Sequence, residues 1–261
     1  MRRRRLRSLL VKPFLLLAHR AEDAAADDEY ASILRLGELE ERELRRVRLE
    51  RGPVTGLDLT AYSGVVLGGG PFCASDPEDG KSDVQRQVEA TIDTVLDEVV
   101  ARDLPFLGLC YGIGTLGRHQ GGVVDRQFGE PVGRLSVAVT EAGRSDPLFE
   151  ELPETFEAFG GHKEALSTTP RRATVLATSA ACPIQAFRVG RNVYALQFHP
   201  ELDSASLQTR IDAYRDYGYF PPEEAESLKA MARERETPHP SGILRRFVRR
   251  YAVASESSSR A

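Results

Sequence analysis

Short apolar runs alternate with amphipathic stretches through the first half of the chain. The apolar runs predict strands at residues 13–18, 62–67 and 104–109, and a further strand is predicted at 44–49. The stretches between and after them predict helices at 27–37, 82–102 and 112–120. In 82–102 the apolar side chains recur at i, i+3 and i+4, as in a helix that lies on a sheet. Strands joined by helical crossovers predict a parallel, doubly wound sheet.

The second half of the chain has a different pattern, with closely spaced strands followed by helices. Strands are predicted at residues 132–140, 157–161, 174–178, 184–189 and 193–198. Gly190-Arg191-Asn192 is typical of a hairpin turn, so part of this half is expected to be antiparallel. Helices are predicted at 204–217, 222–235 and 241–251. The fold class is therefore α/β, with a mostly parallel sheet, helices on both faces and extra C-terminal helices.

The chain of 261 residues is long enough for one large α/β domain. We expect a basic, disordered leader at residues 1–12, the main domain at 13–203, a helical extension packed on that domain at 204–251, and a disordered tail at 252–261. The arginine-rich start resembles a secretory signal, but the apolar run at 14–18 is shorter than the ~7–15 residues such a signal needs. No stretch approaches the ~20 apolar residues of a membrane helix.

Charge and cysteine content narrow the function classes. A formal net charge of -4 argues against a nucleic-acid surface, because such surfaces carry a basic excess. The cysteines Cys73, Cys110 and Cys182 are widely spaced and odd in number, which indicates neither a disulfide framework nor a zinc site. We therefore expect a cytoplasmic protein that binds no metal and no cofactor.

One cysteine lies in a setting suited to nucleophilic catalysis. Cys110 follows the strand at 104–109 within Gly108-Leu109-Cys110-Tyr111-Gly112. Small residues two positions before and after a nucleophile are what a sharp strand-to-helix turn requires. The later segment Gln197-Phe198-His199-Pro200-Glu201 contains a histidine and a carboxylate. If His199 reaches Cys110 and Glu201 holds the other ring nitrogen, the thiol can be activated to attack an acyl carbon.

Six segments in this order and spacing resemble the class I glutamine amidotransferase family, over residues 13 to 203. They are 67–71 with its Gly-Gly-Pro loop, 108–112, Gly121-Gly122-x-Val124, 146–149, 161–164 and 197–201. The nearest likeness is to stand-alone proteins similar to the GMP synthase glutaminase domain. The resemblance implies a flavodoxin-like sheet.

The resemblance also implies a mechanism and a substrate. Cys110 attacks the side-chain amide of L-glutamine, His199 takes the thiol proton and returns it to departing ammonia, and Glu201 orients the imidazole. Backbone N–H groups of Gly70 and Tyr111 are the expected oxyanion hole. A glycine at 70 also makes physical sense, because a loop that closely approaches the substrate has no room for a Cβ. An ammonia-accepting synthase subunit is the expected partner.

Other polar residues carry less specific predictions. By the resemblance, His162 is a candidate for the α-carboxylate and α-amino end of the substrate, and Glu164 is a candidate partner for the α-ammonium. The alternative for His162 is a hydrogen bond to the backbone. Cys73 and Cys182 are expected to be structural, and His19 and His119 to be packed or partly exposed. One position departs from the family: many members carry glutamine four residues past the nucleophile, where this chain has Gly114. This departure concerns substrate specificity rather than hydrolysis.

Two alternatives remain open at the level of sequence. The first is a γ-glutamyl hydrolase of the same fold that acts on another γ-glutamyl amine or peptide. The second is a non-catalytic binding module that docks a partner through residues 204–251. The sequence contains neither a Ser-Gly-Gly-x-Asp-Ser nor a Gly-x-x-x-x-Gly-Lys-[Ser/Thr] phosphate loop, so synthase activity is not expected from this chain alone.

Overall fold

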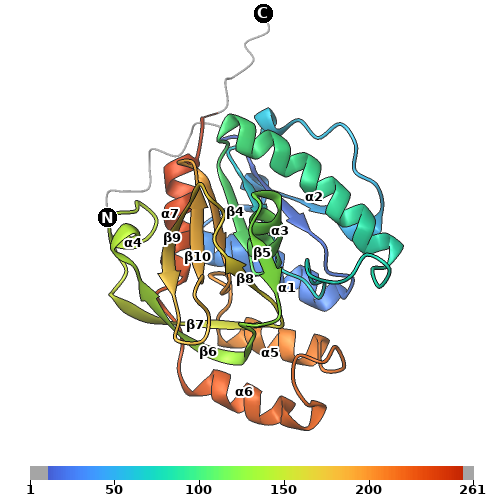
Figure 1. Cartoon of the computed structure of the whole chain (residues 1–261), viewed down its shortest axis with the longest axis vertical. Coiled ribbons are helices and arrows are strands. Elements are labelled where there is room, and N and C mark those ends of the chain that lie inside the picture. Colours follow the sequence, from blue (N-terminus) through green and yellow to red (C-terminus); the bar gives the residue numbers. More distant parts are fainter. Residues whose placement is uncertain (1–10, 255–261) are drawn as a thin grey trace, which may run out of the picture.

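The computed structural model describes residues 11–254, and its centre is a nine-stranded sheet (Figure 1). The strands, in their order across the sheet, are β2 (Leu44–Arg48), β1 (Phe14–Ala18), β3 (Val65–Leu67), β4 (Phe106–Leu109), β11 (Val193–Leu196), β10 (Ala186–Val189), β9 (Ala173–Thr178), β6 (Glu130–Val139) and β7 (Thr155–His162). The first half of the chain and β11 thus form one side of the sheet, and the second half forms the other.

The sheet is parallel on one side and antiparallel on the other. The pairs from β2 to β11 are parallel, and the pairs from β11 to β7 are antiparallel. The parallel order β2-β1-β3-β4-β11 is the doubly wound, flavodoxin-like arrangement that the sequence predicts. Gly190 has φ +60° in the β10–β11 hairpin, which confirms the predicted turn.

Helices cover both faces of the sheet (Figure 1). Their bounds are α1 (Asp23–Gly37), α2 (Asp83–Arg102), α3 (Tyr111–His119), α4 (Glu141–Arg144), α5 (Ser204–Ala213), α6 (Ala225–Glu234) and α7 (Ser241–Tyr251). Helices α1 and α7 pack on one face, and α2 and α3 pack on the other. Helices α5 and α6 pack against each other and cover Phe159 of β7.

The inner parallel strands β1, β3, β4 and β11 bury side chains on both faces, which explains their continuous apolar runs. In β1, Leu16 belongs to the core under α1 and α7, whereas its neighbours Leu15 and Leu17 belong to the core under α2. The pleat of a strand sends successive side chains to opposite faces. A strand with no polar face must therefore lie in the middle of a three-layer structure.

A second, two-stranded sheet was not predicted from the sequence. It pairs β5 (Val123–Asp125) with β8 (Ala165–Thr168) in antiparallel register. Strand β5 is short and Val123 is half exposed, so its sequence lacks a clear alternation of buried and exposed positions. This small sheet connects the end of α3 to the segment after β7.

The ends of the described chain lie together. Val11 forms an isolated antiparallel bridge with Ala254, and the Lys12 backbone N–H donates to Val253 O at 2.9 Å. The inner ends of the predicted leader and tail are therefore paired with each other rather than disordered. The other predicted leader and tail residues, 1–10 and 255–261, lie outside the described residues.

Between residues 11 and 254, no helix combines the length and the apolar character needed to cross a bilayer.

We expect Phe247→Ala to destabilise the protein by about 3–5 kcal/mol, because it leaves a cavity under α7. Phe247 is fully buried, and its ring lies 5.9 Å from that of Phe14 and 5.0 Å from that of Tyr251. Chemical denaturation would measure the change, with Val253→Ala, at a half-exposed position, as the control expected to stay within about 0.5 kcal/mol of wild type. Equal stability of the two variants would contradict the packing of α7 on the shared core.

Candidate active site

The candidate site lies at the carboxyl ends of the parallel strands. Arg20 follows β1, Gly70 follows β3, Cys110 follows β4 and His199 follows β11. All four line one cavity. The loop after β3 lies against three of them, because a Cβ on Gly69 would be 2.8 Å from His199 Cε1, 2.9 Å from Arg20 Nη2 and 3.3 Å from Cys110 Cβ. Ligand sites in open α/β sheets form at this edge.

Cys110 occupies a strained turn between β4 and α3. Its φ of +52° with ψ of −92° is uncommon for a residue with a side chain. The Cys110 N–H donates to Leu196 O of β11 at 2.7 Å, which holds the turn in place. A Cβ on Gly108 would lie 3.0 Å from the backbone of Gly112, so this close approach requires a small residue two positions before Cys110.

His199 and Glu201 form a buried pair. The His199 Nδ1–H donates to Glu201 Oε1 at 2.6 Å, which leaves Nε2 for Cys110. Burial lowers the pKa of His199, but the Glu201 carboxylate and then the neighbouring Cys110 outweigh burial and raise it to about 9. Burial raises the pKa of Glu201, but the facing His199 outweighs it and lowers the value to about 2. The carboxylate thus stabilises an imidazolium beside the thiol.

The loop Gly68-Gly69-Gly70 is held against the site by His19. The His19 Nε2–H donates to Gly68 O at 3.2 Å, and burial, followed by the charge of Arg20, lowers the pKa of His19 to about 3. A Cβ on Gly70 would lie only 2.0 Å from His19 Cε1. This position therefore accepts only glycine unless the histidine ring moves.

The cavity beside Cys110 has a volume of about 60 Å³. Its lining combines the strand-end residues with side chains from the C-terminal helices: Arg20, Gly70, Cys110, Val132, Gly160, Gly161, His199, Leu202, Leu207, Arg210, Ile211, Tyr214, Tyr219 and Phe220. Tyr219 also donates a hydrogen bond to Gly70 O at 3.3 Å. Helix α5 and the segment after it thus complete a site that the strands begin.

The predicted substrate-binding residues His162 and Glu164 do not line this cavity. His162 Nδ1–H donates to Glu164 O at 2.7 Å, and Nε2 bonds to Glu130 Oε2 at 2.9 Å. The Glu164 carboxylate accepts hydrogen bonds from the N–H groups of Ala74 and Ser75 at 2.8 and 2.7 Å. Both side chains are thus committed to protein partners, and their role in binding substrate stays a prediction.

The space beside Gly114 is occupied by Glu164. A Cβ on Gly114 would lie 3.0 Å from Glu164 Oε1 and 3.3 Å from Ala74 Cβ. A glutamine at position 114 would therefore compete with the Glu164 carboxylate for the same volume. Glu164 ties the loop at Ala74 and Ser75 to β8, next to the place that a longer side chain would fill.

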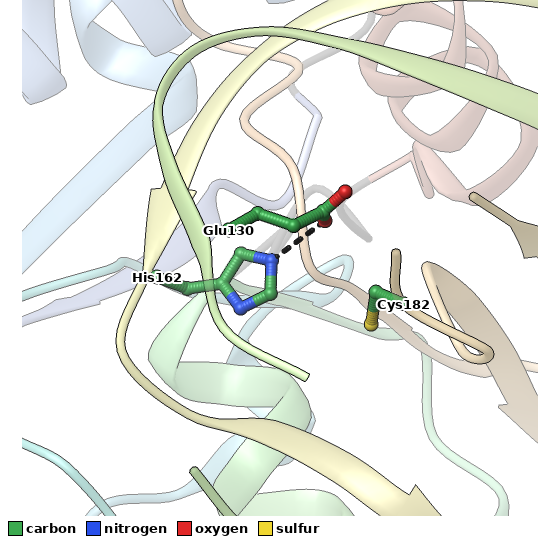
Figure 2. Close-up of side chains that lie close together, drawn as sticks. All are labelled: Glu130, His162 and Cys182. Atoms are coloured by element: carbon green, nitrogen blue, oxygen red, sulfur yellow. Dashed lines mark hydrogen bonds and ion pairs between the residues drawn. The ribbon is translucent and has the colours of Figure 1, made fainter. Parts of the chain in front are cut away.

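Glu130, His162 and Cys182 come close enough to hold a metal ion, with one ligand atom from each lying within 4.8 Å of the others (Figure 2). Their hydrogen bonds favour a buried polar cluster over a metal site. Glu130 also accepts from Ser179 Oγ at 2.8 Å and from Gln185 Nε2. Burial raises the pKa of the Cys182 thiol to about 11, whereas a metal ligand is a thiolate. We therefore assign these groups to a hydrogen-bonded core.

The side chains of the remaining predicted residues contact other protein groups and do not line the cavity. Tyr111 begins α3, and its side chain donates to Glu89 Oε1 at 3.1 Å and packs on His19 with ring centroids 4.6 Å apart. Burial raises the pKa of the Cys73 thiol to about 12, which fits a structural cysteine. His119 bonds to Asp97 Oδ1 at 3.0 Å.

Sequence reasoning did not identify Arg20 or Arg210, although both line the cavity. Arg20 could have been found from its place directly after a predicted strand, where ligand contacts concentrate. Arg210 follows Leu207 and precedes Ile211 on the buried side of α5. A charged residue inside the apolar stripe of a helix is the signal that would have marked it.

Comparison with protein families finds a match over residues 31–212 to the model of the class I glutamine amidotransferases. Because this match covers more than half of the chain, the protein belongs to the class I glutamine amidotransferase family, a family of amide-hydrolysing enzymes.

Curated relatives include glutamine-hydrolysing GMP synthases. The chain is 26% identical to that of Petrotoga mobilis over 147 residues, which cover 56% of this chain and 26% of the relative. It is 31% identical to that of Lactobacillus delbrueckii subsp. bulgaricus over 160 residues, which cover 61% of this chain and 28% of the relative. The match thus spans about a quarter of the length of these relatives.

Solved structures share the fold over nearly the whole chain. A glutamine amidotransferase from Thermotoga maritima matches with a TM-score of 0.75 and 24% identity, over 92% of this chain and 98% of that chain. A glutamine amido transferase from Methylobacillus flagellatus matches with a TM-score of 0.71 and 16% identity, over 96% and 100%. These likenesses support the α/β architecture described above.

We expect Glu201→Gln to lower the pKa of His199 by about 1–3 units, because burial then outweighs the remaining charges. Titration of ¹³C-labelled histidine by NMR would measure the shift. In the wild type the folded pKa of about 9 lies above the ordinary 6.5, so the imidazolium stabilises the fold fully below pH 6.5, and this contribution is lost as the pH rises through 9.

A control variant and a contradicting result complete this test of the His199–Glu201 pair. Glu234→Gln, which removes a carboxylate paired with Arg134 on the surface, serves as the control and should leave the His199 titration unchanged. An unaltered His199 pKa in Glu201→Gln would contradict the coupling of the pair.

Proposed function

We propose that the chain hydrolyses the side-chain amide of L-glutamine through a γ-glutamyl thioester on Cys110. The observation that carries this proposal is the hydrogen-bonded pair of His199 and Glu201 beside Cys110, with Cys110 and His199 lining one cavity. A thiol, an imidazole and a buried carboxylate in this order are what nucleophilic acyl transfer needs. The glutamine-hydrolysing relatives support the choice of substrate.

The first half of the reaction forms the thioester. The Cys110 sulfur attacks the amide carbon of glutamine, and its proton passes to His199. His199 then gives that proton to the amide nitrogen as the C–N bond breaks, and ammonia leaves. In the second half, water attacks the thioester, His199 takes its proton, and the S–C bond breaks to release glutamate and restore the thiol.

The oxyanion that forms in both halves needs donors, and we propose the backbone N–H groups of Gly70 and Tyr111. Gly70 lines the cavity, and Tyr111 begins helix α3. N–H donors at the start of a helix stabilise an oxyanion more strongly, because the helix dipole adds a partial positive charge there.

A partner is part of the proposal. Ammonia released at Cys110 would pass to a synthase subunit, as the longer GMP synthase relatives suggest. We further propose that residues 13–203 form the catalytic domain and that 204–251 form a helical extension of it, because α5 and Tyr219 complete the cavity. The unpaired cysteines suit a reducing cytoplasm.

The direct test measures ammonia and glutamate release from glutamine by the purified chain. We expect Cys110→Ala to lower the rate at least about 10³-fold, because no other group can form the thioester. Cys73→Ala is the matched control, since this buried thiol has a pKa of about 12 and should be dispensable.

The other outcomes are also informative. Release that survives Cys110→Ala would overturn the mechanism, and turnover confined to other γ-glutamyl amines would favour a γ-glutamyl hydrolase. If no compound is turned over, an electrophilic glutamine analogue separates the remaining cases. Labelling of Cys110 would indicate an enzyme that needs its partner, whereas a silent thiol would favour a binding module.

We expect Gly70→Ala to lower kcat about 10²–10³-fold, the usual cost of one lost oxyanion donor. The added Cβ would lie 2.0 Å from His19 Cε1, so the loop has to move. His19→Ala in the same chain should restore part of the rate by emptying that space. Gly80→Ala, whose Cβ would meet Pro77 O at an ordinary 3.4 Å, is the control. A kcat for Gly70→Ala within about threefold of wild type would contradict a displacement of this loop by the contact with His19.

A further inference from the structure

The cavity beside Cys110 contains two buried arginines. Arg20 is 3% exposed and Arg210 is 6% exposed, and both line the cavity. A guanidinium is always charged at neutral pH and loses its hydration when it is buried. Each of these side chains therefore needs an anion or a set of acceptors near it.

Arg20 has such partners within the protein. Its Nε donates to Glu29 Oε1 at 3.0 Å, and its Nη1 donates to the Tyr214 hydroxyl at 2.9 Å. Glu29 is fully buried, so this ion pair is shielded from solvent. Arg20 is thus an anchored cation next to the nucleophile.

Arg210 is not satisfied in the same way. Its Nε and Nη2 are buried and have no hydrogen-bond partner. The nearest carboxylate oxygens are Asp28 Oδ2 at 3.7 Å from Nε and Glu29 Oε1 at 3.8 Å from Nη2, which is ion-pair range but too far for hydrogen bonds. Burial, followed by the charge of Arg20, lowers the pKa of Arg210.

The acidic groups around the two arginines do not complete the hydrogen bonds of Arg210. Glu29 Oε1 faces both guanidinium groups, and Glu201 is paired with His199. Asp28 is the one further carboxylate near Arg210 among the ion pairs of residues 11–254. The cavity therefore has donor capacity for one more anion.

The rest of the α5 side of the cavity is apolar, with Leu207, Ile211 and Phe220. A guanidinium within apolar walls is a typical arrangement for binding a carboxylate, because the planar fork matches two oxygens and the walls exclude water. The volume of about 60 Å³ admits a small group of that kind.

We propose that Arg210 binds a carboxylate of the γ-glutamyl compound that Cys110 attacks, and so selects an anionic substrate. The proposal rests on the function proposed above for its acyl chemistry. The carboxylate can come from two sources, the α-carboxylate of the glutamyl group or a carboxylate on the amine that leaves. Arg210 thereby contributes to specificity from outside the catalytic triad.

The first test uses two alkylating reagents of nearly equal size, iodoacetate and iodoacetamide. With each, the Cys110 sulfur displaces iodide from the CH₂ carbon, and only the charge of the added group differs. We expect the rate ratio of iodoacetate to iodoacetamide to fall at least about tenfold in Arg210→Gln, in keeping with the loss of a charge-assisted hydrogen bond. Cys110→Ala should remain unlabelled, since Cys73 and Cys182 are buried.

Two further variants show whether the effect is specific to Arg210. Arg215→Gln removes the same charge from an exposed position after α5 and should keep the wild-type ratio. Arg210→Lys keeps the charge without the fork and should give an intermediate ratio, which also serves if Arg210→Gln fails to fold. An unchanged ratio in both Arg210 variants would overturn the proposal. An equal slowing of both reagents would also overturn it, because Arg210 would then act on the thiol rather than on the carboxylate.

The second test identifies the source of the carboxylate from kcat/KM. Wild type and Arg210→Gln are compared on glutamine, on glutamine with an amidated α-carboxyl group, on γ-glutamylglycine and on γ-glutamylmethylamide. A loss of at least about tenfold on every compound with a free α-carboxylate identifies that group. A loss confined to γ-glutamylglycine identifies the leaving amine, and no loss on any compound overturns the proposal.

The two proposals can fail separately. Alkylation reports on Cys110 and Arg210 whether or not glutamine is hydrolysed. A chain that is inactive on all amides but prefers iodoacetate in an Arg210-dependent manner keeps the carboxylate site and loses the glutaminase assignment. A glutaminase with no such preference gives the reverse result.

Discussion

The parallel pairing of β4 with β11 is the constraint on which the site depends. The register places Leu109 opposite Leu196, and the Cys110 N–H bonds to Leu196 O at 2.7 Å. Cys110 and His199 therefore leave the sheet at the same edge, although the whole antiparallel half of the fold separates them in sequence. A slip of one residue in this pair would turn the side chains to opposite faces. The buried apolar residues of both strands, such as Phe106 and Val193, hold the register.

Around that pairing, the protein surrounds the thiol with groups that are costly to bury. Cys110 has positive φ, His199 and Glu201 are charged partners, and Arg20 and Arg210 add two cations. The fold accommodates each of these groups because neighbouring residues hold it in place. His19, for example, holds the loop that contains Gly70. The C-terminal segment takes part in this, since Tyr219 bonds to the same loop and α5 supplies Arg210. Strand ends supply Cys110 and His199, and α5 with the segment after it supplies much of the cavity around them.

The sequence is informative where local pattern and tertiary structure agree. Apolar runs identified the inner parallel strands because both of their faces are buried. The small residues around Cys110 identified the turn because Gly108 closely approaches the backbone of Gly112 there. Strand β5 escaped detection because it is short and half exposed. The contacts of Arg210 with Asp28 and Glu29 depend on the packing of α5 on α1, which no local pattern reports. The hydrogen bond between His162 and Glu130 likewise joins two strands that are far apart in sequence.

The contact between Val11 and Ala254 has a topological consequence. The two segments are hydrogen-bonded neighbours beside Ser63, which precedes β3, and so lie at the amino-terminal edge of the parallel strands, opposite Cys110. The described chain is therefore nearly a closed loop. A short peptide could join its ends, and new ends could be opened in the largely exposed loop at 53–58 with the strand order unchanged. A circularly permuted chain would connect the same strands in a different sequence order and keep the geometry at their carboxyl ends.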